Sequence, residues 1–290
     1  MPTTAKGTAY TEFTATPPGG ELTLWAIPDT LIGTPGIPIV LYTHGASGGY
    51  NQFATSSAWT GLREWLIDNG IAWVEGVGGG PQAWGNLAQR NSYPISLLYV
   101  MGIIGGSSPI IILGRSMGGL VAYWLATQSS FASQVVGLVL SSAVTNLEEW
   151  ILPPPIGYEF RVAYGLAQDG LNYEEKTAGF HPLEFDPALF AGKNILSLVG
   201  DADTTVPPTT NTYPMREHWA GQPAIDRLEV RAGGDHSQGN GTYTMVAPMA
   251  AFISDVLGLT PPPKPILLRV LEEYIILGGK AHVTTPLVTP

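Results

Sequence analysis

Short runs of aliphatic and β-branched residues alternate with longer amphipathic segments along most of this chain. The apolar runs predict strands at 37–43, 71–77, 109–113, 135–142, 194–199 and 225–230. The segments between them predict helices at 57–69, 86–104, 119–127, 212–220 and 243–257. Uninterrupted apolar runs are typical of strands buried on both faces of a parallel sheet. The alternation therefore predicts an α/β fold with helices on both faces of that sheet.

Two parts of the chain depart from this alternation. Polar and apolar residues alternate loosely on either side of a Pro-Pro-Gly-Gly turn at 17–20, which predicts a hairpin. Between about 145 and 193 the alternation stops, and the segment is rich in proline and aromatic residues. We therefore divide the chain into N-terminal strands and hairpin at 1–36, a core at 37–144 and 194–260, an insertion at 145–193, and a proline-rich linker with a C-terminal tail at 261–290.

Composition narrows the range of possible partners. The 290 residues are 44% hydrophobic, which is enough for one large domain with a sizeable core. Only 12% are charged, so we expect a surface of neutral polar loops, and the net charge of −10 argues against nucleic acid and anionic membranes as partners. The chain has no cysteine, which excludes disulfides, thiolate chemistry and cysteine-ligated zinc.

The N-terminal residues and the lengths of the apolar stretches give an expectation about where the protein is located. Residues 1–7 hold no apolar run after a basic start, so we expect no signal peptide. No stretch approaches the roughly 20 apolar residues that span a bilayer, so we expect no membrane segment. Cytoplasmic and virion-associated locations both agree with these features.

The pentapeptide Gly114-Arg115-Ser116-Met117-Gly118 lies between a predicted strand and a predicted helix. A serine at such a junction, with glycine on both sides, is the sequence form of a nucleophile elbow. The turn strains the serine backbone, and larger side chains at the flanking positions would clash. The serine hydroxyl then stands clear of the sheet, and the helix N-terminus faces the charge that develops on the substrate. Ser116 is therefore the candidate nucleophile.

A serine nucleophile needs a base within hydrogen-bond reach. The histidines are His44, His181, His218, His236 and His282. His236 lies in a polar, glycine-rich loop after the last predicted strand and before the last helix, from which it can reach back to Ser116. We predict that His236 is the base, that His44 holds its own loop by hydrogen bonds, and that His218 is solvated on a surface helix.

The acid that orients this base should follow another strand end. Asp201 and Asp203 both follow the strand at 194–199. We favour Asp203, because Asp201 is one step beyond the strand, where a carboxylate more often caps a turn. Asp226 and Asp235 are weaker candidates and are expected to be turn or surface residues.

The remaining candidates concern the oxyanion and the substrate. The segment His44-Gly45-Ala46-Ser47-Gly48-Gly49 follows the strand at 37–43, and the backbone N–H of Ala46, paired with that of Met117, is expected to form an oxyanion hole, with Ser47 a less favoured donor. Candidate pocket residues are Trp84, Asn86, Trp150 and Tyr158, each of which could instead serve only to pack its own segment. Arg115 is expected to form a local salt bridge rather than to bind substrate. The glycines at 78–80 are not a phosphate loop, because no Gly-Lys-Ser/Thr follows them.

The order Ser116, Asp203, His236, with His44-Gly45 upstream, resembles the α/β-hydrolase family and its serine esterase and lipase-like branch. The resemblance covers residues 37–257. It implies an eight-stranded, mostly parallel sheet in which 145–193 is a cap inserted after the sixth strand. The serine at the elbow argues against the branches that use aspartate there, the haloalkane dehalogenases and epoxide hydrolases. The loop at 44–49 departs from the HGGG form of the family.

Two functions follow from these features. The first is a serine hydrolase that cleaves a carboxylic ester of a small-molecule or lipid-like substrate through an acyl-enzyme, with no metal or organic cofactor. An amidase, a thioesterase or an acyltransferase would use the same residues. The alternative is a hydrolase-fold component of a larger assembly, for example a phage virion or tail protein. Its tail at 261–290 would dock a protein partner or self-assemble, with or without envelope-directed esterase activity.

Overall fold

The structure of this protein is a computed structural model that describes residues 2–106, 108–150, 156–167, 169 and 172–259. The chain divides into one large unit, Met1–Leu257, and a second segment, Gly258–Pro290. The linker and tail predicted at 261–290 lie outside the described residues. The hypothesis that this tail docks a partner therefore stays a prediction.

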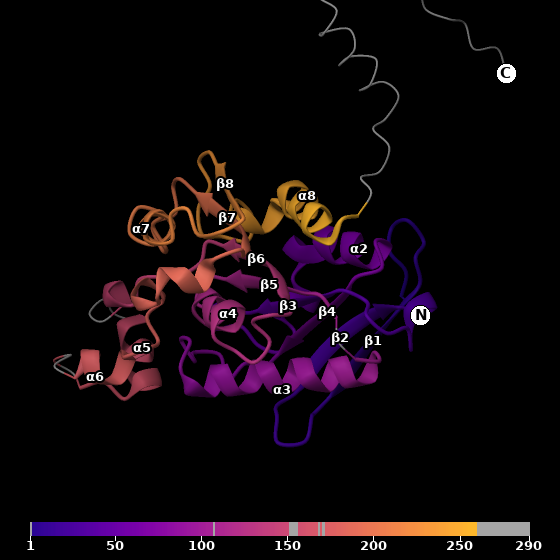
Figure 1. The fold of residues 1–290 in the computed structure, drawn as a ribbon, viewed down its shortest axis with the longest axis horizontal. Coiled ribbons are helices and arrows are strands. Elements are labelled where there is room, and N and C mark those ends of the chain that lie inside the picture. Colours follow the sequence, from indigo (N-terminus) through magenta and orange to yellow (C-terminus); the bar gives the residue numbers. More distant parts are fainter. Residues whose placement is uncertain (1, 107, 151–155, 168, 170–171, 260–290) are drawn as a thin grey trace, which may run out of the picture. The chain divides into compact units, whose positions relative to one another are not determined.

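Eight strands form one sheet in the order β1-β2-β4-β3-β5-β6-β7-β8 (Figure 1). Neighbouring strands from β4 to β8 in this order run parallel, whereas β2 is antiparallel to both β1 and β4. The predicted eight-stranded, mostly parallel sheet is confirmed, and the N-terminal hairpin supplies its antiparallel edge. The strands are β1 Tyr10–Ala15, β2 Thr23–Pro28, β3 Ile39–Thr43, β4 Ala72–Gly76, β5 Ile110–Arg115, β6 Val135–Ser141, β7 Asn194–Gly200 and β8 Ile225–Arg231.

Helices cover both faces of the sheet, as predicted. Figure 1 shows α2 (Thr60–Asp68) and α8 (Val246–Leu257) on one side of it, and α3 (Leu87–Ile103) and α4 (Gly118–Thr127) on the other. The remaining helices are α1 Gln52–Thr55, α5 Ile156–Tyr164, α6 Tyr173–Thr177 and α7 Thr212–His218. Across the described ranges, no helix combines the length and the apolar character needed to cross a lipid bilayer.

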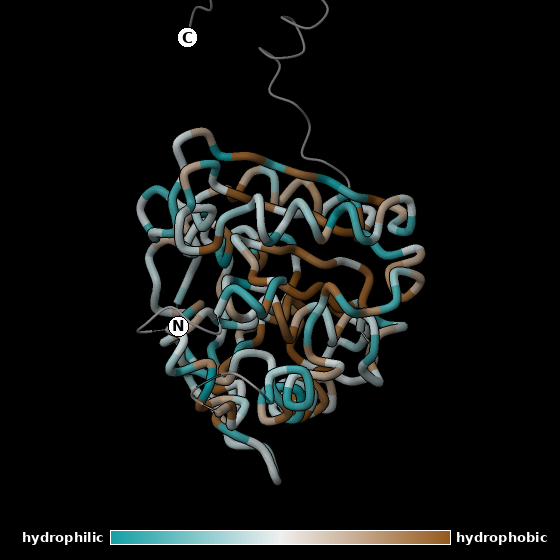
Figure 2. Tube along the Cα trace, turned by 90° about the vertical axis from the view of Figure 1, so that its left-hand side faces the viewer, coloured by the Kyte–Doolittle hydropathy of each residue, from teal (hydrophilic) through white to brown (hydrophobic). Residues whose placement is uncertain are grey.

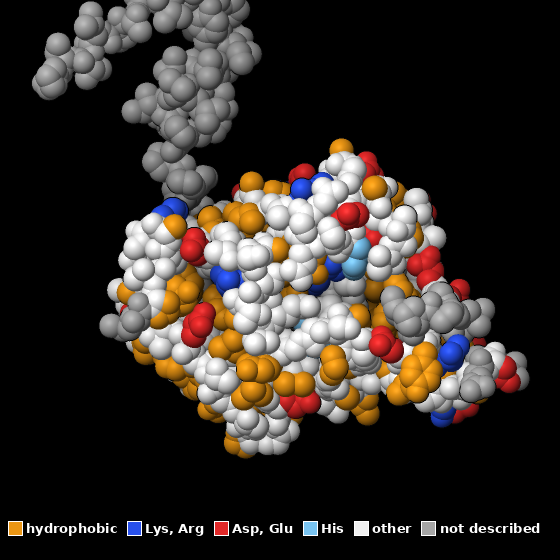
Figure 3. Space-filling view, turned by 180° about the vertical axis from the view of Figure 1, so that it is seen from behind, with side chains coloured by type: hydrophobic (Ala, Val, Ile, Leu, Met, Phe, Trp, Pro, Cys, Tyr) orange, Lys and Arg blue, Asp and Glu red, His pale blue; other side chains and the backbone are white. Residues whose placement is uncertain are grey.

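The central strands are apolar along their whole length because both of their faces are covered. Every residue of β3, β4 and β5 is buried. The hydrophobic segments run through the middle of the tube in Figure 2. On the face shown in Figure 3, charged side chains are scattered among neutral groups, which agrees with the low charge content. The site is built at the ends of these buried central strands and their neighbours.

The segment between β6 and β7 contains α5 and α6 and corresponds to the insertion expected after the sixth strand. Its aromatic side chains Phe160, Tyr164 and Tyr173 are buried in a cluster with Trp84 and Trp150. Most of the aromatic content of this segment is therefore used to pack it against the rest of the unit.

Arg90 of α3 binds the segment between β6 and β7. Its guanidinium lies 4.1 Å from the ring centre of Phe180 and donates a hydrogen bond of 2.8 Å to the carbonyl oxygen of Gly179. A cation over an aromatic face and a hydrogen bond to a backbone carbonyl together fix this side of the insertion.

Candidate active site

Ser116 lies at the turn between β5 and α4, with φ of 50°. This left-handed backbone is unfavourable for a side-chain-bearing residue and is found where surrounding structure enforces it. A Cβ atom at Gly118 would lie 2.1 Å from the carbonyl oxygen of Thr43, and one at Gly114 would lie 2.7 Å from Cβ of Ala122. The glycines flanking Ser116 are therefore required by close approach of β3 and α4, as the sequence predicted.

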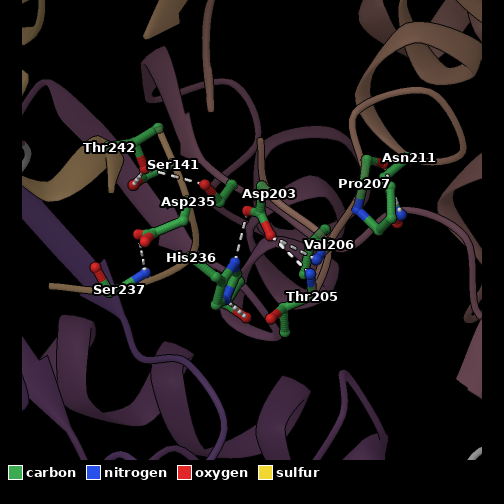
Figure 4. A network of polar contacts seen from close by, with 12 residues as sticks. Ser141, Asp203, Thr205, Val206, Pro207, Asn211, Asp235, His236, Ser237 and Thr242 are labelled. Carbon is green, nitrogen blue, oxygen red and sulfur yellow. Dashed lines mark hydrogen bonds and ion pairs between the residues drawn. The ribbon is translucent and has the colours of Figure 1, made fainter. Parts of the chain in front are cut away.

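Two further side chains approach Ser116 from the carboxyl ends of later strands. His236 follows β8, and its Nε2 atom lies 3.0 Å from Oγ of Ser116. Its Nδ1 atom lies 2.7 Å from Oδ2 of Asp203, which follows β7. The other oxygen of Asp203 accepts the backbone N–H groups of Thr205 and Val206, each at 2.9 Å (Figure 4). The three side chains predicted to act together thus form one continuous hydrogen-bonded chain.

The environment sets opposite protonation states for the two titratable groups. Burial lowers the pKa of His236 below its usual value, and the Arg115 charge acts in the same direction, against the raising effect of Asp203. Burial alone would raise the pKa of Asp203, but the hydrogen bond and charge of His236, with the two backbone N–H groups, hold it below its usual value. At neutral pH the imidazole is therefore neutral and the carboxylate ionised.

The backbone N–H groups of Ala46 and Met117 were the predicted oxyanion donors. Met117 directly precedes the first residue of α4, and Ala46 lies on the wall of the cavity at Ser116. Within the described part of the chain, neither N–H donates a hydrogen bond. The N–H of Ser47, in contrast, donates to the carbonyl oxygen of Pro81 at 2.8 Å. Of these three candidate donors, the N–H of Ser47 is therefore the one that already has a partner among the described residues.

His44 holds the loop that carries Ala46. Its Nδ1 and Nε2 atoms lie 2.9 Å from the carbonyl oxygen of Gly45 and 2.8 Å from that of Val77. Its backbone N–H donates to the Tyr93 hydroxyl at 3.0 Å. Both ring nitrogens are occupied by backbone groups, so His44 serves the structural role expected of it.

A cavity of about 440 Å³ opens at Ser116. Its wall is formed by Gly45, Ala46, Ser47, Gln52, Trp84, Arg115, Ser116, Trp150, Thr205, His236, Ser237, Gln238 and Tyr243. Two of the four candidate pocket residues are among them: the rings of Trp84 and Trp150 lie 5.1 Å apart and form an aromatic side of the cavity. The rest of the wall includes the neutral hydroxyl and amide side chains of Ser47, Gln52, Thr205, Ser237 and Gln238.

The other two candidate pocket residues do not line this cavity. Oδ1 of Asn86 accepts the backbone N–H of Gln89 at the start of α3, and its Nδ2 donates to the carbonyl oxygen of Ala163. Both ends of this amide are used to cap a helix and to hold the insertion. Tyr158 on α5 is 65% exposed. The prediction that these two residues form the pocket is therefore corrected.

Arg115 also differs from its prediction. No carboxylate of a described residue forms an ion pair with it. Its Nη1 atom instead lies 2.8 Å from Nε2 of His236, and its Nη2 donates to the carbonyl oxygen of His236 at 2.9 Å. Asp203, whose charge acts on Arg115, is instead bound to the opposite edge of the His236 ring.

The remaining acidic candidates have structural roles, as expected. Asp201 accepts the backbone N–H of Gly233, Asp235 accepts that of Ser237, and Asp226 pairs with Arg216.

The histidine of α7 departs from its prediction. Nε2 of His218 lies 2.6 Å from the carbonyl oxygen of Phe185, so this side chain is half-buried rather than solvated.

The wall residues Gln52, Thr205, Gln238 and Tyr243 were not predicted. Thr205 could have been found, because it shares the loop of Asp203. Gln52 accepts hydrogen bonds from the Tyr42 hydroxyl and from the N–H of Gly45, and so supports the loop of Ala46. No local pattern distinguishes this glutamine from a surface residue.

Within the described ranges, no group of three or more His, Asp or Glu side chains is placed to hold a metal ion.

Comparison with known proteins identifies the architecture. A search with the sequence found no matching family model and no matching curated protein. Among solved structures, a prolyl endopeptidase superimposes with a TM-score of 0.65 and 16% identity, over 86% of this chain and 38% of its own. A puromycin-hydrolysing peptidase of Mycobacterium tuberculosis gives 0.64 and 18%, over 89% of this chain and 41% of its own.

A smaller protein gives a similar result. A cold-adapted esterase from an Arctic intertidal metagenomic library superimposes with a TM-score of 0.54 and 15% identity, over 85% of this chain and 93% of its own. The chain spans about two fifths of the length of the two peptidases above. At these identities the likeness establishes the fold, and the chain has the α/β-hydrolase fold.

Proposed function

We propose that this protein is a serine hydrolase that cleaves a carboxylic ester through an acyl-enzyme. The observation that carries the proposal is the chain of contacts from Asp203 through His236 to Ser116, at the wall of a 440 Å³ cavity. A nucleophile, a base within reach of it and an acid that orients the base are the parts that this chemistry requires.

Acylation begins with attack on the ester carbonyl. Oγ of Ser116 forms a bond to the carbonyl carbon, and its proton moves to Nε2 of His236. The charge that develops on the carbonyl oxygen is stabilised by the backbone N–H groups of Ala46 and Met117. The bond to the leaving alcohol then breaks, and the alcohol oxygen takes the proton from Nε2. Asp203 holds the imidazole in place and stabilises its charged form.

Deacylation repeats these steps with water. His236 takes a proton from the water molecule, and the water oxygen attacks the acyl carbon. The bond between this carbon and Oγ of Ser116 then breaks, and Oγ regains its proton from Nε2. The products are an acid and an alcohol, and the site returns to its starting state.

Peptide-bond cleavage is the second candidate, because two of the superimposed structures are peptidases. The same residues would serve it, but an amine leaves less readily than an alcohol and needs full protonation by His236. A site that cleaves amides is therefore expected to cleave activated esters as well. An ester substrate tests both reactions, and a matched amide distinguishes them.

The test compares the wild type with Ser116→Ala and Ser47→Ala on p-nitrophenyl esters of increasing acyl length, with a fluorophosphonate probe in parallel. Ser47 lies on the wall of the same cavity, and its hydroxyl accepts a hydrogen bond from Gln82, so Ser47→Ala is the matched control. We expect turnover and labelling in the wild type and the control, and neither in Ser116→Ala. Equal turnover in Ser116→Ala would overturn the proposal. p-Nitroanilides with the same acyl groups then separate esterase from amidase activity.

A further inference from the structure

We propose that Arg115, the residue immediately before the nucleophile, is a positioning residue that holds the His236 ring in the tautomer with an unprotonated Nε2, within reach of Ser116. This inference rests on the proposed function, because it assigns a role in the operation of the same site. It goes beyond the three side chains that the chemistry requires.

Two contacts join Arg115 to His236. Nη1 lies 2.8 Å from the ring atom Nε2, and Nη2 donates to the backbone carbonyl oxygen of the same residue at 2.9 Å. One contact fixes the ring and the other fixes the loop that carries it. Because the planar guanidinium makes both, the side chain and main chain of His236 are held in one relative orientation.

The contact with Nε2 also selects the tautomer of the imidazole. A guanidinium only donates hydrogen bonds, so Nε2 must be the acceptor and carry no proton. The ring proton is then on Nδ1, where it is donated to Asp203 at 2.7 Å. This is the tautomer in which Nε2 can accept the proton of Ser116, whose Oγ lies 3.0 Å away.

The guanidinium is itself held firmly and without a counter-ion. Arg115 is 2% exposed, and its Cζ lies 4.1 Å from the ring centre of Tyr243, in the 3₁₀ turn Thr242–Thr244. No described carboxylate forms an ion pair with it, and its buried Nε has no acceptor. Its charge is therefore not neutralised by a direct partner and acts on the adjacent imidazole.

The charges around His236 therefore oppose one another. Asp203 from the loop after β7 and Asp235 from the loop of His236 itself favour the protonated imidazole, whereas Arg115 from β5 disfavours it. Tyr42 of β3 and Tyr243 face the guanidinium, and both stay neutral at physiological pH because burial raises the pKa of each. Arg115 should therefore keep the base neutral, and so available, at lower pH than the two carboxylates would allow.

The arrangement also permits the proton to arrive at Nε2. Nε2 has one lone pair, which accepts a hydrogen from Nη1 or from Ser116 but not from both, so Nη1 must withdraw when Ser116 transfers its proton. The contact of Nη2 with the His236 carbonyl and the packing on Tyr243 do not involve Nε2. They keep Arg115 in place, so that Nη1 can donate to Nε2 again once the proton has left the ring.

The experiment measures kcat/KM against pH for the wild type, Arg115→Met, Arg115→Lys and Arg227→Met, with a neutral ester. Arg227 pairs with Asp255 on the surface, so Arg227→Met changes the net charge equally away from the site. We expect the acidic limb of Arg115→Met to move up by about one pH unit, which is the size of effect that an adjacent charge has. Arg115→Lys, which keeps the charge, should restore most of this shift, and Arg227→Met should show none.

If the acidic limb of kcat/KM has the same midpoint pH in Arg115→Met as in the wild type, the proposal is overturned. A lower rate alone would not support it, because a change in packing also lowers the rate. If Arg115→Met does not fold, Arg115→Gln removes the charge with a smaller change in packing, and the same shift is expected.

A titration of His236 by NMR in the Ser116→Ala background, assigned by the loss of one signal in His236→Gln, needs no turnover. It therefore separates failure of this inference from failure of the proposed function. Loss of the Arg115 charge should raise the midpoint of that titration, and an unchanged midpoint would contradict the role of Arg115.

Discussion

Nδ1 of His236 lies 2.7 Å from Oδ2 of Asp203, although the two residues are 33 positions apart in the chain. The contact forms because β7 and β8 are adjacent and parallel, so the loops that follow them meet at the same edge of the sheet. Asp203 is 4% exposed and both of its oxygens are hydrogen-bonded. A buried carboxylate held in this way can fix one orientation of a histidine ring.

Asp203→Asn should therefore impair the reaction more than binding. The amide keeps the shape of the side chain but permits the wrong imidazole tautomer, so we expect kcat to fall by about 10³ to 10⁴. Asp201→Asn is the matched control, because Asp201 follows the same strand but accepts the backbone N–H of Gly233 instead of binding His236. Steady-state kinetics of both variants test the expected fall in kcat. Equal losses of activity in the two would show that Asp203 has no special role.

The pH dependence of activity should have its acidic limb below the usual histidine range. Burial lowers the pKa of His236 below 6.5, and only the neutral ring can accept the proton of Ser116. Activity should therefore persist below pH 6.5 and fall as the pH drops through the lowered value. A profile of kcat/KM between pH 4 and 8 checks this, and a midpoint above 6.5 would contradict it.

The same shift should appear in stability. The unfolded chain binds a proton at His236 near pH 6.5, whereas the folded protein resists it, so the free energy of unfolding should decrease as pH falls below 6.5. His236→Gln should show a weaker decrease over this range, measured by urea unfolding at several pH values. An identical pH dependence in both proteins would exclude this contribution.

Gly118→Ala should strongly destabilise the fold. The new Cβ would lie 2.1 Å from the backbone oxygen of Thr43, which cannot move without displacing β3. We expect a loss of at least about 3 kcal/mol in the free energy of unfolding. Gly102→Ala is the control, because a Cβ at this position of α3 meets nothing within 4 Å, and it should stabilise the helix by about 0.5–1 kcal/mol. Urea unfolding measures both changes.

Trp150→Ala should change the preference for acyl length. Trp150 forms the aromatic side of the cavity together with Trp84, and its removal enlarges the space beside Ser116. We expect kcat/KM to shift toward longer acyl chains on p-nitrophenyl esters, with a loss of about 3–5 kcal/mol in stability because a large buried side chain is removed. Tyr158→Ala, at an exposed residue of the same segment, should leave the profile unchanged. If only Tyr158→Ala changed the acyl-length profile, the acyl pocket would lie at Tyr158 and not at Trp150.

The sequence by itself determined the order of the strands and main helices outside 145–193, the elbow at Ser116 and the loops that carry Asp203 and His236. These features are local: apolar runs mark strands buried on both faces, paired glycines mark a tight turn, and polar loops after parallel strands end at a common edge. The choice of Asp203 over Asp201 also depended only on distance from the strand end.

The tertiary structure alone decided which side chains share the cavity. Asn86 caps α3 and binds the inserted segment, so it is not on the wall, whereas Gln52 and Tyr243 are. Arg115 contacts a histidine 121 positions away instead of a nearby carboxylate. Such contacts depend on how side chains from distant segments pack and on which partners remain free. Periodicity along the chain carries no information about either.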